Sequence, residues 1–232
     1  MKIAIAGYKG RMGQMLVREL ESGAYPGLSF FGGTVSSDNP ENLFDADAVI
    51  DFTTPEATRK HIWLAAKHHK PIVIGTTGMN EQDLNEMHDA AAECALLYSA
   101  NMSVGVNLLA ALVEQASSRL ADFDIEILET HHRNKVDAPS GTALMLGKAT
   151  GRSAAAIDRS GKRAAGTLGY AVQRGGDVAG EHSVSFFGTG ERLELSHRAH
   201  DRSLFAKGAI RAAQWLTEKP HGFYSMRDML GL

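Results

Sequence analysis

The first twenty residues most narrowly limit the folds open to this chain of 232 residues. A continuous apolar segment, Lys2–Ala6, leads directly into a glycine-rich turn, Gly7–Gly13, which is followed by the helical run Gln14–Leu20. A strand, a glycine turn and a helix in this order form the context that a dinucleotide-binding fingerprint requires. The segment therefore predicts the first strand–helix unit of a buried parallel sheet.

The glycine spacing in this turn is G-x-x-G-x-x-G, a relative of the more usual G-x-G-x-x-G. Gly10 and Gly13 fall on the last two glycines of that pattern. We expect Gly10 to let the backbone approach a pyrophosphate and Gly13 to let helix and strand pack closely. The alternative interpretation is a plain tight turn before a helix, with no ligand.

Apolar segments and helical segments continue to alternate along the first half of the chain. This alternation predicts a doubly wound parallel sheet, in which ligands bind beyond the carboxyl ends of the strands. Two polar, glycine-containing segments, Gly75–Thr77 and Ser99–Met102, fall at such ends. The expected strands are 28–35, 46–52, 71–78 and 95–102, with helices at 56–70 and 80–94 between them.

The second half of the chain has a different pattern, with strands that alternate at period two around short glycine turns. We expect a strand at 123–129, a helix at 143–149, and an antiparallel sheet with one polar face from 170–176, 181–187 and 191–198. That polar face is either solvated or paired with another subunit. Helices are expected at 103–120 and 203–216, and a mobile loop at 151–166.

The predicted fold is therefore α/β, with an N-terminal Rossmann-type doubly wound parallel sheet and a C-terminal α+β domain with a mostly antiparallel sheet. We expect residues 1–102, completed by the C-terminal segment 203–232, to form a dinucleotide-binding domain. Residues 103–202 are expected to form the substrate-binding and oligomerisation domain.

Charge and composition exclude several classes of partner. The formal net charge of −3 argues against a general nucleic-acid binder, because surfaces that track phosphates are normally basic. The longest nearly apolar run, Val104–Val113, is too short to span a bilayer, and the N-terminus lacks the organisation of a signal peptide. A single cysteine, Cys94, excludes an internal disulfide and fits a reducing compartment. We therefore expect a cytoplasmic protein with no nucleic-acid or membrane partner.

The stretch Glu129–Leu144 carries the densest chemistry in the chain. His131, His132, Arg133 and Lys135 bring two imidazoles, a guanidinium and an ammonium into five residues. Ser140 then suits the N-cap of a helix, and Gly141 and Thr142 would offer backbone N–H groups in its first turn. Such a helix start binds anions, so the stretch predicts a reaction site for a small substrate that carries carboxylates.

Other interpretations of the histidines remain open at this point. The pair could be two loop residues that cap backbone carbonyls. A more specific alternative is a metal site built from His131, His132, His197 and His200. No H-E-x-x-H helix or cysteine ligand set supports it, so we expect no metal. Because neighbours on an extended chain point in opposite directions, only one of His131 and His132 can be assumed to face a ligand.

The choice of cofactor is suggested by the residues after the second predicted strand. An NAD-preferring protein usually carries an acid there for the ribose hydroxyls, but this chain has Val35, Ser36 and Ser37. Lys9 and Arg11 in the glycine turn could instead meet a 2′-phosphate. We therefore expect NADPH, or dual use of NADPH and NADH, rather than strict use of NADH; in the alternative, both cations face solvent.

Together, these motifs resemble a known family. The glycine turn, Asp51-Phe52-Thr53, Gly75–Gly78, the segment Asn101–Asn107 and the stretch His131–Thr142 are similar to those of the bacterial 4-hydroxy-tetrahydrodipicolinate reductase (dihydrodipicolinate reductase) family of the diaminopimelate–lysine pathway. The resemblance runs from the first strand through Met226–Leu230, and its most specific part is His131–Thr142. It implies NAD(P)H-dependent reduction of 4-hydroxy-tetrahydrodipicolinate to tetrahydrodipicolinate, with loss of water, by a cytoplasmic homotetramer.

The resemblance also implies roles for individual residues. The family's catalytic histidine falls on His131 and its proton-donating lysine on Lys135, while its substrate-binding positions fall on His132, Ser140, Gly141 and Thr142. The sequence departs from the family where an acid often stands at Val35 or Ser36, and where some members have arginine at Thr54. The cofactor-binding positions fall on Gly7, Tyr8, Lys9, Gly10, Arg11 and Met12, on Gly75, Thr76 and Thr77, and on Ser99, Ala100, Asn101 and Met102.

Two further functions share the expected first domain. One is an amino-acid-type dehydrogenase, which would oxidise hydroxy or amino acids. The other is a regulatory protein that senses NADPH and turns nothing over. A turnover assay with the aspartate-semialdehyde/pyruvate condensation product separates all three.

Overall fold

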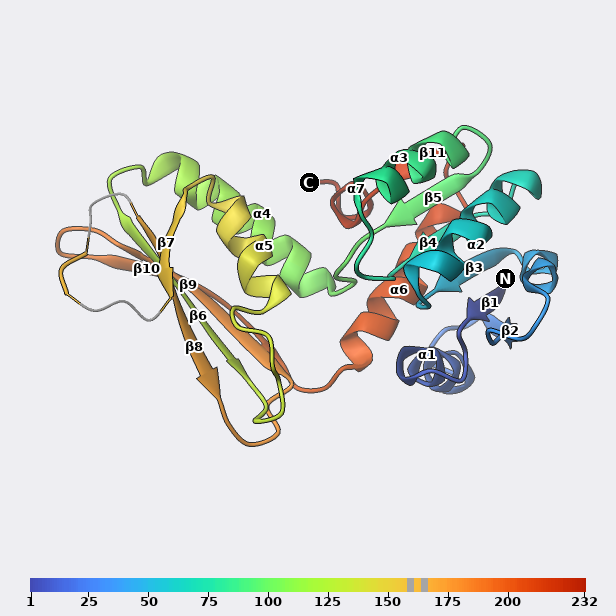
Figure 1. Ribbon diagram of the computed structural model, residues 1–232, viewed down its shortest axis with the longest axis horizontal. Helices are drawn as coiled ribbons and strands as arrows, with labels where there is room; N and C mark the ends of the chain where they lie inside the picture. The colour runs from blue at the N-terminus through green and yellow to red at the C-terminus, as the bar shows by residue number, and fades with distance from the viewer. Residues whose placement is uncertain (158–160, 164–166) are drawn as a thin grey trace. The chain divides into compact units, whose positions relative to one another are not determined.

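The structure, a computed structural model, describes residues 1–157, 161–163 and 167–232. It contains two compact units, the first formed by Met1–Val104 together with Ser203–Leu232 and the second by Gly105–Arg202 (Figure 1). The functions expected of the two parts, dinucleotide binding and substrate binding, remain predictions.

The first unit is built on a six-stranded sheet in the order β11-β5-β4-β3-β1-β2, and every neighbouring pair of strands is parallel. β1 lies between β2 on one side and β3 on the other, so the chain winds outward in both directions, as in a doubly wound sheet. This part of the fold prediction is confirmed. The strands are β1 (Lys2–Ala6), β2 (Ser29–Thr34), β3 (Ala48–Asp51), β4 (Ile72–Ile74), β5 (Ala95–Tyr98) and β11 (Gly222–Tyr224).

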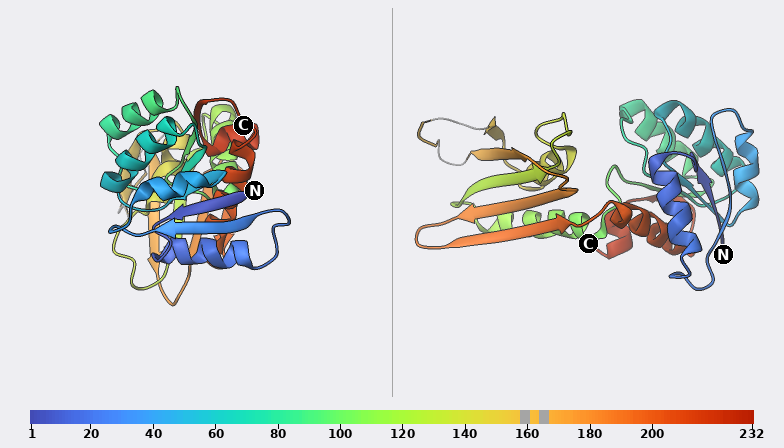
Figure 2. Two further views of the ribbon diagram at one scale, coloured as in Figure 1. Left: turned by 90° about the vertical axis from the view of Figure 1, so that its right-hand side faces the viewer. Right: turned by 90° about the horizontal axis from the view of Figure 1, so that it is seen from below.

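Helices cover both faces of this sheet, and the alternation of side chains along β1 shows why. Ile3 and Ile5 pack on the face covered by α1 and α6, whereas Ala4 and Ala6 pack on the face covered by α2 and α3 (Figures 1 and 2). Because both faces of the sheet are buried, all residues of β1 after the exposed Lys2 are apolar. The helices are α1 (Arg11–Glu21), α2 (Pro55–Lys67), α3 (Glu81–Ala90), α6 (Ser203–Leu216), α7 (Met226–Leu230) and the 3-10 helix η1 (Pro40–Asp45).

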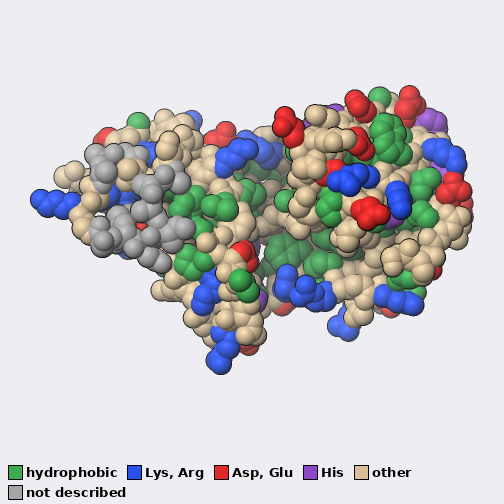
Figure 3. All heavy atoms as spheres, in the orientation of Figure 1, with side chains coloured by type: hydrophobic (Ala, Val, Ile, Leu, Met, Phe, Trp, Pro, Cys, Tyr) green, Lys and Arg blue, Asp and Glu red, His purple; other side chains and the backbone are tan. Residues whose placement is uncertain are grey.

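Strands β4 and β5 end earlier than the apolar pattern predicts. β4 ends at Ile74 and β5 at Tyr98, so the segments 75–78 and 99–103 are loops at the carboxyl edge of the sheet. The predicted ligand-binding segments therefore lie beyond the strand ends, where such sheets bind ligands. In the space-filling view, acidic, basic and apolar side chains alternate over the visible face of this unit, without a large patch of one charge (Figure 3).

The second unit contains a five-stranded sheet in the order β10-β9-β6-β8-β7. β9 is antiparallel to both β6 and β10, whereas β8 is parallel to both β6 and β7, so the sheet is mixed. The prediction that the segment at 170–176 joins an antiparallel pattern is wrong. Between β6 and β8 the chain forms a helix and β7, so it returns to the starting end of β6 and β8 runs parallel to it. The strands are β6 (Asp124–His131), β7 (Ala154–Ile157), β8 (Leu168–Arg174), β9 (Gly180–Phe187) and β10 (Arg192–Ala199).

The segment 151–166 was expected to be a loop, and the structure corrects its first part. β7 lies in it and forms the edge of the sheet beside β8. Residues 158–160 and 164–166 of that prediction lie outside the described residues.

One face of the second sheet is covered by α4 (Val104–Arg119) and α5 (Gly141–Ala149) (Figure 1). Leu109 and Val113 of α4 and Leu146 of α5 pack there against residues of β6 and β9 such as Ile127 and Phe186. Along β10, the predicted polar residues Arg192, Glu194, Ser196 and Arg198 are exposed. No helix within the described ranges is long and apolar enough to cross a membrane.

Candidate active site

A buried carboxylate at the end of β6 organises the reactive stretch. The side chain of Glu129 is fully buried and accepts two hydrogen bonds from the Arg174 guanidinium, at 2.8 and 2.9 Å, and one from the Ser140 backbone N–H, at 3.0 Å. A further hydrogen bond joins it to Nδ1 of His131, the last residue of β6. Arg174 reaches Glu129 because the parallel register of β6 and β8 places Arg174 beside His131.

These hydrogen bonds decide the charge of Glu129. Burial by itself raises the pKa of a carboxyl group, but the hydrogen bonds from Arg174, His131 and Ser140 outweigh it and hold the pKa of Glu129 below its ordinary value. Glu129 is therefore an ionised carboxylate. Arg174 supplies its counter-charge, and the hydrogen bonds that Arg174 donates to Glu129 in turn raise the pKa of Arg174.

His131 is a buried imidazole, with only 8% of its surface exposed. Since the Glu129 carboxylate can only accept, Nδ1 of His131 carries the proton of their hydrogen bond, and Nε2 is left as an acceptor. Burial lowers the pKa of His131, and together with the nearby cations Lys135 and Arg174 it outweighs Glu129, which raises that pKa. At neutral pH the ring is therefore neutral. Gly180 leaves room beside it, since a Cβ at that position would lie 3.0 Å from Nε2.

Ser140 links this network to the start of α5. Its Oγ accepts a hydrogen bond from the Ala143 backbone N–H at 3.2 Å, which confirms the predicted N-cap. The same Oγ lies 3.0 Å from Nε2 of His182. Burial lowers the pKa of His182 to about 4, so this ring is also neutral, and it meets the His131 ring edge-on with centroids 5.1 Å apart.

The other predicted residues lie on the loop between β6 and α5. His132 leaves the strand with its backbone N–H bonded to the Val178 carbonyl oxygen at 2.8 Å. The half-buried Lys135 ammonium donates to Asp137 at 2.8 Å, and this hydrogen bond lowers the pKa of the Asp137 carboxyl. Whereas His131 is buried, His132 lines an open hollow. The other residues that line this hollow are Arg133, Asn134, Gly176 and Asp177.

The start of α5 has the features of a carboxylate-binding turn. Gly141 is exposed, and a Cβ placed on it would meet no atom within 4 Å, so the backbone there is open to a ligand. The first turn carries no acidic residue that would repel an anion. With Lys135 on the preceding loop, the second unit thus combines an anion-binding helix start, an ammonium and a neutral imidazole within one connection.

The first unit carries the expected cofactor loops at one edge of its sheet. The segments 7–12, 75–77 and 99–102 follow β1, β4 and β5, respectively, at their carboxyl ends. Gly7 has a positive φ of 77°, and a Cβ on Gly13 would lie 2.2 Å from the Gly7 carbonyl oxygen, so the turn and α1 pack as closely as predicted. Gly10 is the N-cap of α1 and makes no side-chain cap, which leaves this helix start suited to a phosphate.

Two predicted cofactor residues can take part only through their backbone. The Thr76 hydroxyl is buried and bonded to the Thr58 hydroxyl at 2.9 Å and to the Thr53 backbone N–H at 3.1 Å. Met102 is 1% exposed and packs in the core. In contrast, Lys9 and Arg11 are exposed, and neither pairs with an acid in the part of the chain that the structure describes.

Three side chains near these sites were not singled out from the sequence. Arg174 and His182 complete the buried network, but their contacts depend on strand pairing, which no local pattern reveals. Asp38 lies one residue beyond Ser37, and its carboxylate accepts the Val35 backbone N–H at 2.8 Å.

The rival metal site is not assembled from the predicted histidines. Among the described residues, the groupings with metal-binding geometry are Glu129–His131–His182 and His69–Glu93–His221, and neither contains His132, His197 or His200. In the first grouping, both carboxylate oxygens of Glu129 already bind Arg174, and His131 donates to the same carboxylate. The Arg174 guanidinium would repel a metal cation at this position. The network is therefore better suited to hold His131 in one tautomer than to bind a metal.

Comparison with known proteins agrees with this architecture. Two family models match the chain, one described as "Dihydrodipicolinate reductase, N-terminus" over residues 18–102 and the other as "Dihydrodipicolinate reductase, C-terminus" over residues 105–230. A solved structure described as "Dipicolinate bound Dihydrodipicolinate reductase", from a Paenisporosarcina species, superposes with a TM-score of 0.81. It is 22% identical, with 97% of each chain covered, and so supports the fold.

Curated relatives are considerably more similar in sequence. A 4-hydroxy-tetrahydrodipicolinate reductase of Rhizobium rhizogenes is 46% identical, over 100% of this chain and 97% of the relative. The protein of the same name from Agrobacterium fabrum is 45% identical over the same shares. Matches of this extent, together with the two family models, identify the family directly. The chain belongs to the dihydrodipicolinate reductase family.

Proposed function

We propose that this chain reduces 4-hydroxy-tetrahydrodipicolinate to tetrahydrodipicolinate with NAD(P)H, with loss of water, in diaminopimelate and lysine biosynthesis. Relatives 45–46% identical over the whole chain carry the name of this reductase. The structural observation that carries the proposal is the connection from β6 to α5, where a neutral imidazole, an ammonium and a capped helix start occur together. The Paenisporosarcina reductase, which was solved with dipicolinate bound, supports a small dicarboxylate as the ligand class.

The residues of this connection divide the chemistry of the reaction. Gly141 and Thr142 at the start of α5 hold a substrate carboxylate, and His132 contacts the substrate from the loop. Lys135 donates the proton that accompanies reduction, and Asp137 keeps its ammonium oriented. His131, neutral and held by Glu129, presents Nε2 as a proton acceptor or hydrogen-bond partner. The nicotinamide, when bound, supplies the hydride.

Replacement of Lys135 tests the proposal most directly. In Lys135→Ala the proton donor is lost, so we expect kcat to fall by about 10²-fold or more while cofactor affinity is unchanged. The assay follows loss of cofactor absorbance with the freshly prepared aspartate-semialdehyde/pyruvate condensation product. Asp137→Asn is the matched control, because it removes the partner of Lys135 but keeps the ammonium, and its loss should be much smaller. An unchanged rate in Lys135→Ala would remove the lysine from the donor role.

For the cofactor, we propose dual use with NADPH favoured. The exposed cations Lys9 and Arg11 beside the uncapped start of α1 support this preference, because they can meet a 2′-phosphate. A comparison of kcat/KM with the two cofactors measures it. In Arg11→Ala the advantage of NADPH should shrink by about tenfold, as expected for the loss of one charge-assisted contact. A large advantage of NADH in the wild-type protein would contradict the preference.

We also propose a cytoplasmic homotetramer built through the sheet of the second unit. The face that α4 and α5 leave uncovered carries the exposed polar residues of β10 together with Phe187 of β9 and Leu128 of β6, which are 41% and 38% exposed. Apolar side chains of this size on an uncovered sheet face favour a protein partner. Sedimentation equilibrium measures the assembly, and Phe187→Glu should shift it toward smaller species.

A further inference from the structure

The amino edge of the sheet in the first unit carries a cluster that the reductase reaction does not use. His69, Glu93 and His221 lie in three loops that lead into the neighbouring parallel strands β4, β5 and β11, respectively. Because these strands are parallel and adjacent, the three loops meet at one edge of the sheet. The cofactor loops follow the carboxyl ends of the strands, so the cluster lies at the opposite edge.

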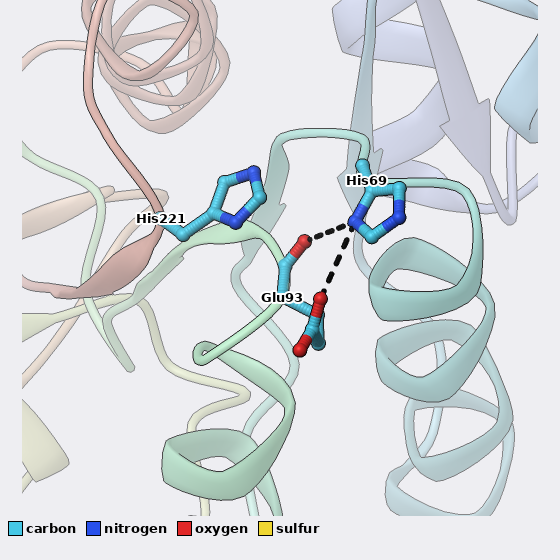
Figure 4. Close-up of side chains that lie close together, drawn as sticks. All are labelled: His69, Glu93 and His221. Carbon is cyan, nitrogen blue, oxygen red and sulfur yellow. Dashed lines mark hydrogen bonds and ion pairs between the residues drawn. The ribbon is translucent and has the colours of Figure 1, made fainter.

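The three side chains face one another. Nδ1 of His69 lies 2.9 Å from the Glu93 backbone carbonyl oxygen and 3.6 Å from its carboxylate (Figure 4). The ring of His221 lies parallel to that of His69, with centroids 5.7 Å apart, and it reaches toward the other two from the loop before β11. One possible ligand atom from each residue lies within 4.8 Å of the other two.

This spacing is close to what a shared metal ion requires. Nitrogen and oxygen ligands lie about 2.0–2.2 Å from zinc, so two ligands of one tetrahedral ion are about 3.3 Å apart. Exposed side chains reach that separation by small rotations of their torsion angles. Two imidazoles and one carboxylate are donors that suit zinc and similar transition-metal ions, whereas magnesium and calcium prefer oxygen ligands alone.

The backbone at His69 adds a second observation. His69 has a φ of 51°, and it is the one described non-glycine residue with a positive φ. It follows the end of α2, where its N–H bonds to the Ala66 carbonyl oxygen at 3.2 Å, and glycine is the residue most often found in this conformation. The histidine thus takes a backbone conformation that disfavours most side chains, and in this conformation its Nδ1 lies 2.9 Å from the Glu93 carbonyl oxygen.

We propose that His69, Glu93 and His221 bind one divalent transition-metal ion of the zinc type, with water completing its coordination. The ion connects the loop before β11 to the loops before β4 and β5, and so holds the C-terminal strand β11 against the rest of the sheet. Its role is structural, because the cofactor loops lie at the other end of the strands.

The experiment measures zinc binding by the full-length protein after treatment with a chelator. Isothermal titration with zinc chloride at pH 7.5 gives affinity and stoichiometry, and thermal unfolding with and without zinc gives the stabilisation. Three variants remove ligands: His69→Gly, which suits the positive φ, Glu93→Gln and His221→Ala. His88→Ala is the matched control, since it removes an exposed histidine of α3 that stacks on Phe223 of β11 but belongs to no grouping with metal-binding geometry among the described residues.

We expect one zinc ion per chain, and a rise in Tm of about 5 °C or more when free zinc exceeds its Kd a hundredfold. Each of the three ligand variants should weaken binding at least tenfold, whereas His88→Ala should bind as the wild-type protein does. Magnesium chloride should produce no rise in Tm. The proposal is overturned if the wild-type protein binds no zinc, or if His69→Gly combined with His221→Ala binds zinc as tightly as the wild-type protein. The latter outcome would place the ion elsewhere, with Glu129–His131–His182 as the remaining candidate.

Discussion

At the scale of single residues, the stretch from β6 to α5 is held together by the fully buried carboxylate of Glu129. Glu129 fixes the tautomer of His131, binds Arg174 and holds the backbone of Ser140. His131 and Ser140 are separated by eight residues of loop, and Glu129 is the group that connects both. We therefore expect Glu129 to act as a positioning residue, through His131 and the start of α5.

Glu129→Gln should therefore impair both activity and stability. An amide can accept only part of the guanidinium's hydrogen bonds, and it leaves the partly buried Arg174 without a counter-charge, which costs about 3 kcal/mol. We expect kcat to fall about 10²-fold with a smaller change in KM, and the pH profile of kcat to move because His131 loses its fixed tautomer. Steady-state kinetics between pH 5.5 and 8.5 and urea unfolding check both effects.

The matched control is Glu126→Gln on the same strand. Glu126 pairs with Arg163 at 2.6 Å, three residues before Glu129 along β6 and therefore on the opposite face of the sheet. Its replacement should cost some stability but leave the pH profile of kcat unchanged. If both variants change the profile alike, Glu129 has only a structural role.

At the scale of elements, local sequence signals located some helix starts and missed others. Ser140 caps α5 as predicted and α6 occupies the predicted range Ser203–Leu216, whereas α1 begins at Arg11, three residues before the predicted run. Such caps are made within three or four residues, so the sequence displays them directly. The direction of β8 and the existence of β7 and β11 were missed, since pairing between distant strands leaves no mark on such short segments.

Gly13, in the first turn of α1, gives a prediction at this scale. In Gly13→Ala, the new Cβ would lie 2.2 Å from the Gly7 carbonyl oxygen and 2.5 Å from the Tyr8 Cα, and neither backbone atom can move aside cheaply. We expect a loss of about 3 kcal/mol or more, or failure to fold. Thermal unfolding measures it.

A second variant, Gly10→Ala, tests cofactor binding at the same glycine motif even if Gly13→Ala does not fold. A Cβ on Gly10 would come near only the Gly7 carbonyl oxygen, at 3.1 Å, so the fold should be kept. Because the same Cβ would occupy the space that a pyrophosphate needs, cofactor affinity should fall at least tenfold in a fluorescence titration. Equal cofactor binding by Gly10→Ala and the wild-type protein would argue against phosphate contact at this turn.

At the scale of the whole molecule, the buried histidines make stability depend on pH. The pKa of His182 is about 4 in the folded protein, compared with 6.5 as its ordinary value. The unfolded chain therefore takes up a proton first as the pH falls, and stability is lost from about pH 6.5 down to about pH 4. The shift corresponds to about 3 kcal/mol at the lower end, and the lowered pKa of His131 adds to the loss in the same direction.

Urea unfolding between pH 7.5 and pH 4.5 checks this dependence. His182→Gln should flatten the fall in unfolding free energy over that range, although its stability at pH 7.5 will be lower because the contact with Ser140 changes. His200→Gln, at an exposed position, should keep the wild-type slope. A slope that stays the same in His182→Gln would show that this ring does not control acid sensitivity.

Much of the protein can be derived from its sequence alone. The alternation of apolar strands with helices, the glycine turn, the cap at Ser140 and the reactive stretch from His131 to Thr142 are all visible as patterns among near neighbours in the chain. A periodic apolar pattern or a capping residue acts over a few residues, so its outcome is visible before folding is considered.

Only the tertiary structure decided which distant residues complete those local features. Arg174 meets Glu129, and His182 meets Ser140, because β8 and β9 lie on either side of β6, and nothing in the separate segments specifies that order. The same holds for His69, Glu93 and His221, which become neighbours only when β4, β5 and β11 align. Interactions between near neighbours in the chain determine where helices and strands form. Which distant side chains come into contact is determined by burial and strand pairing, and these depend on all helices and strands together.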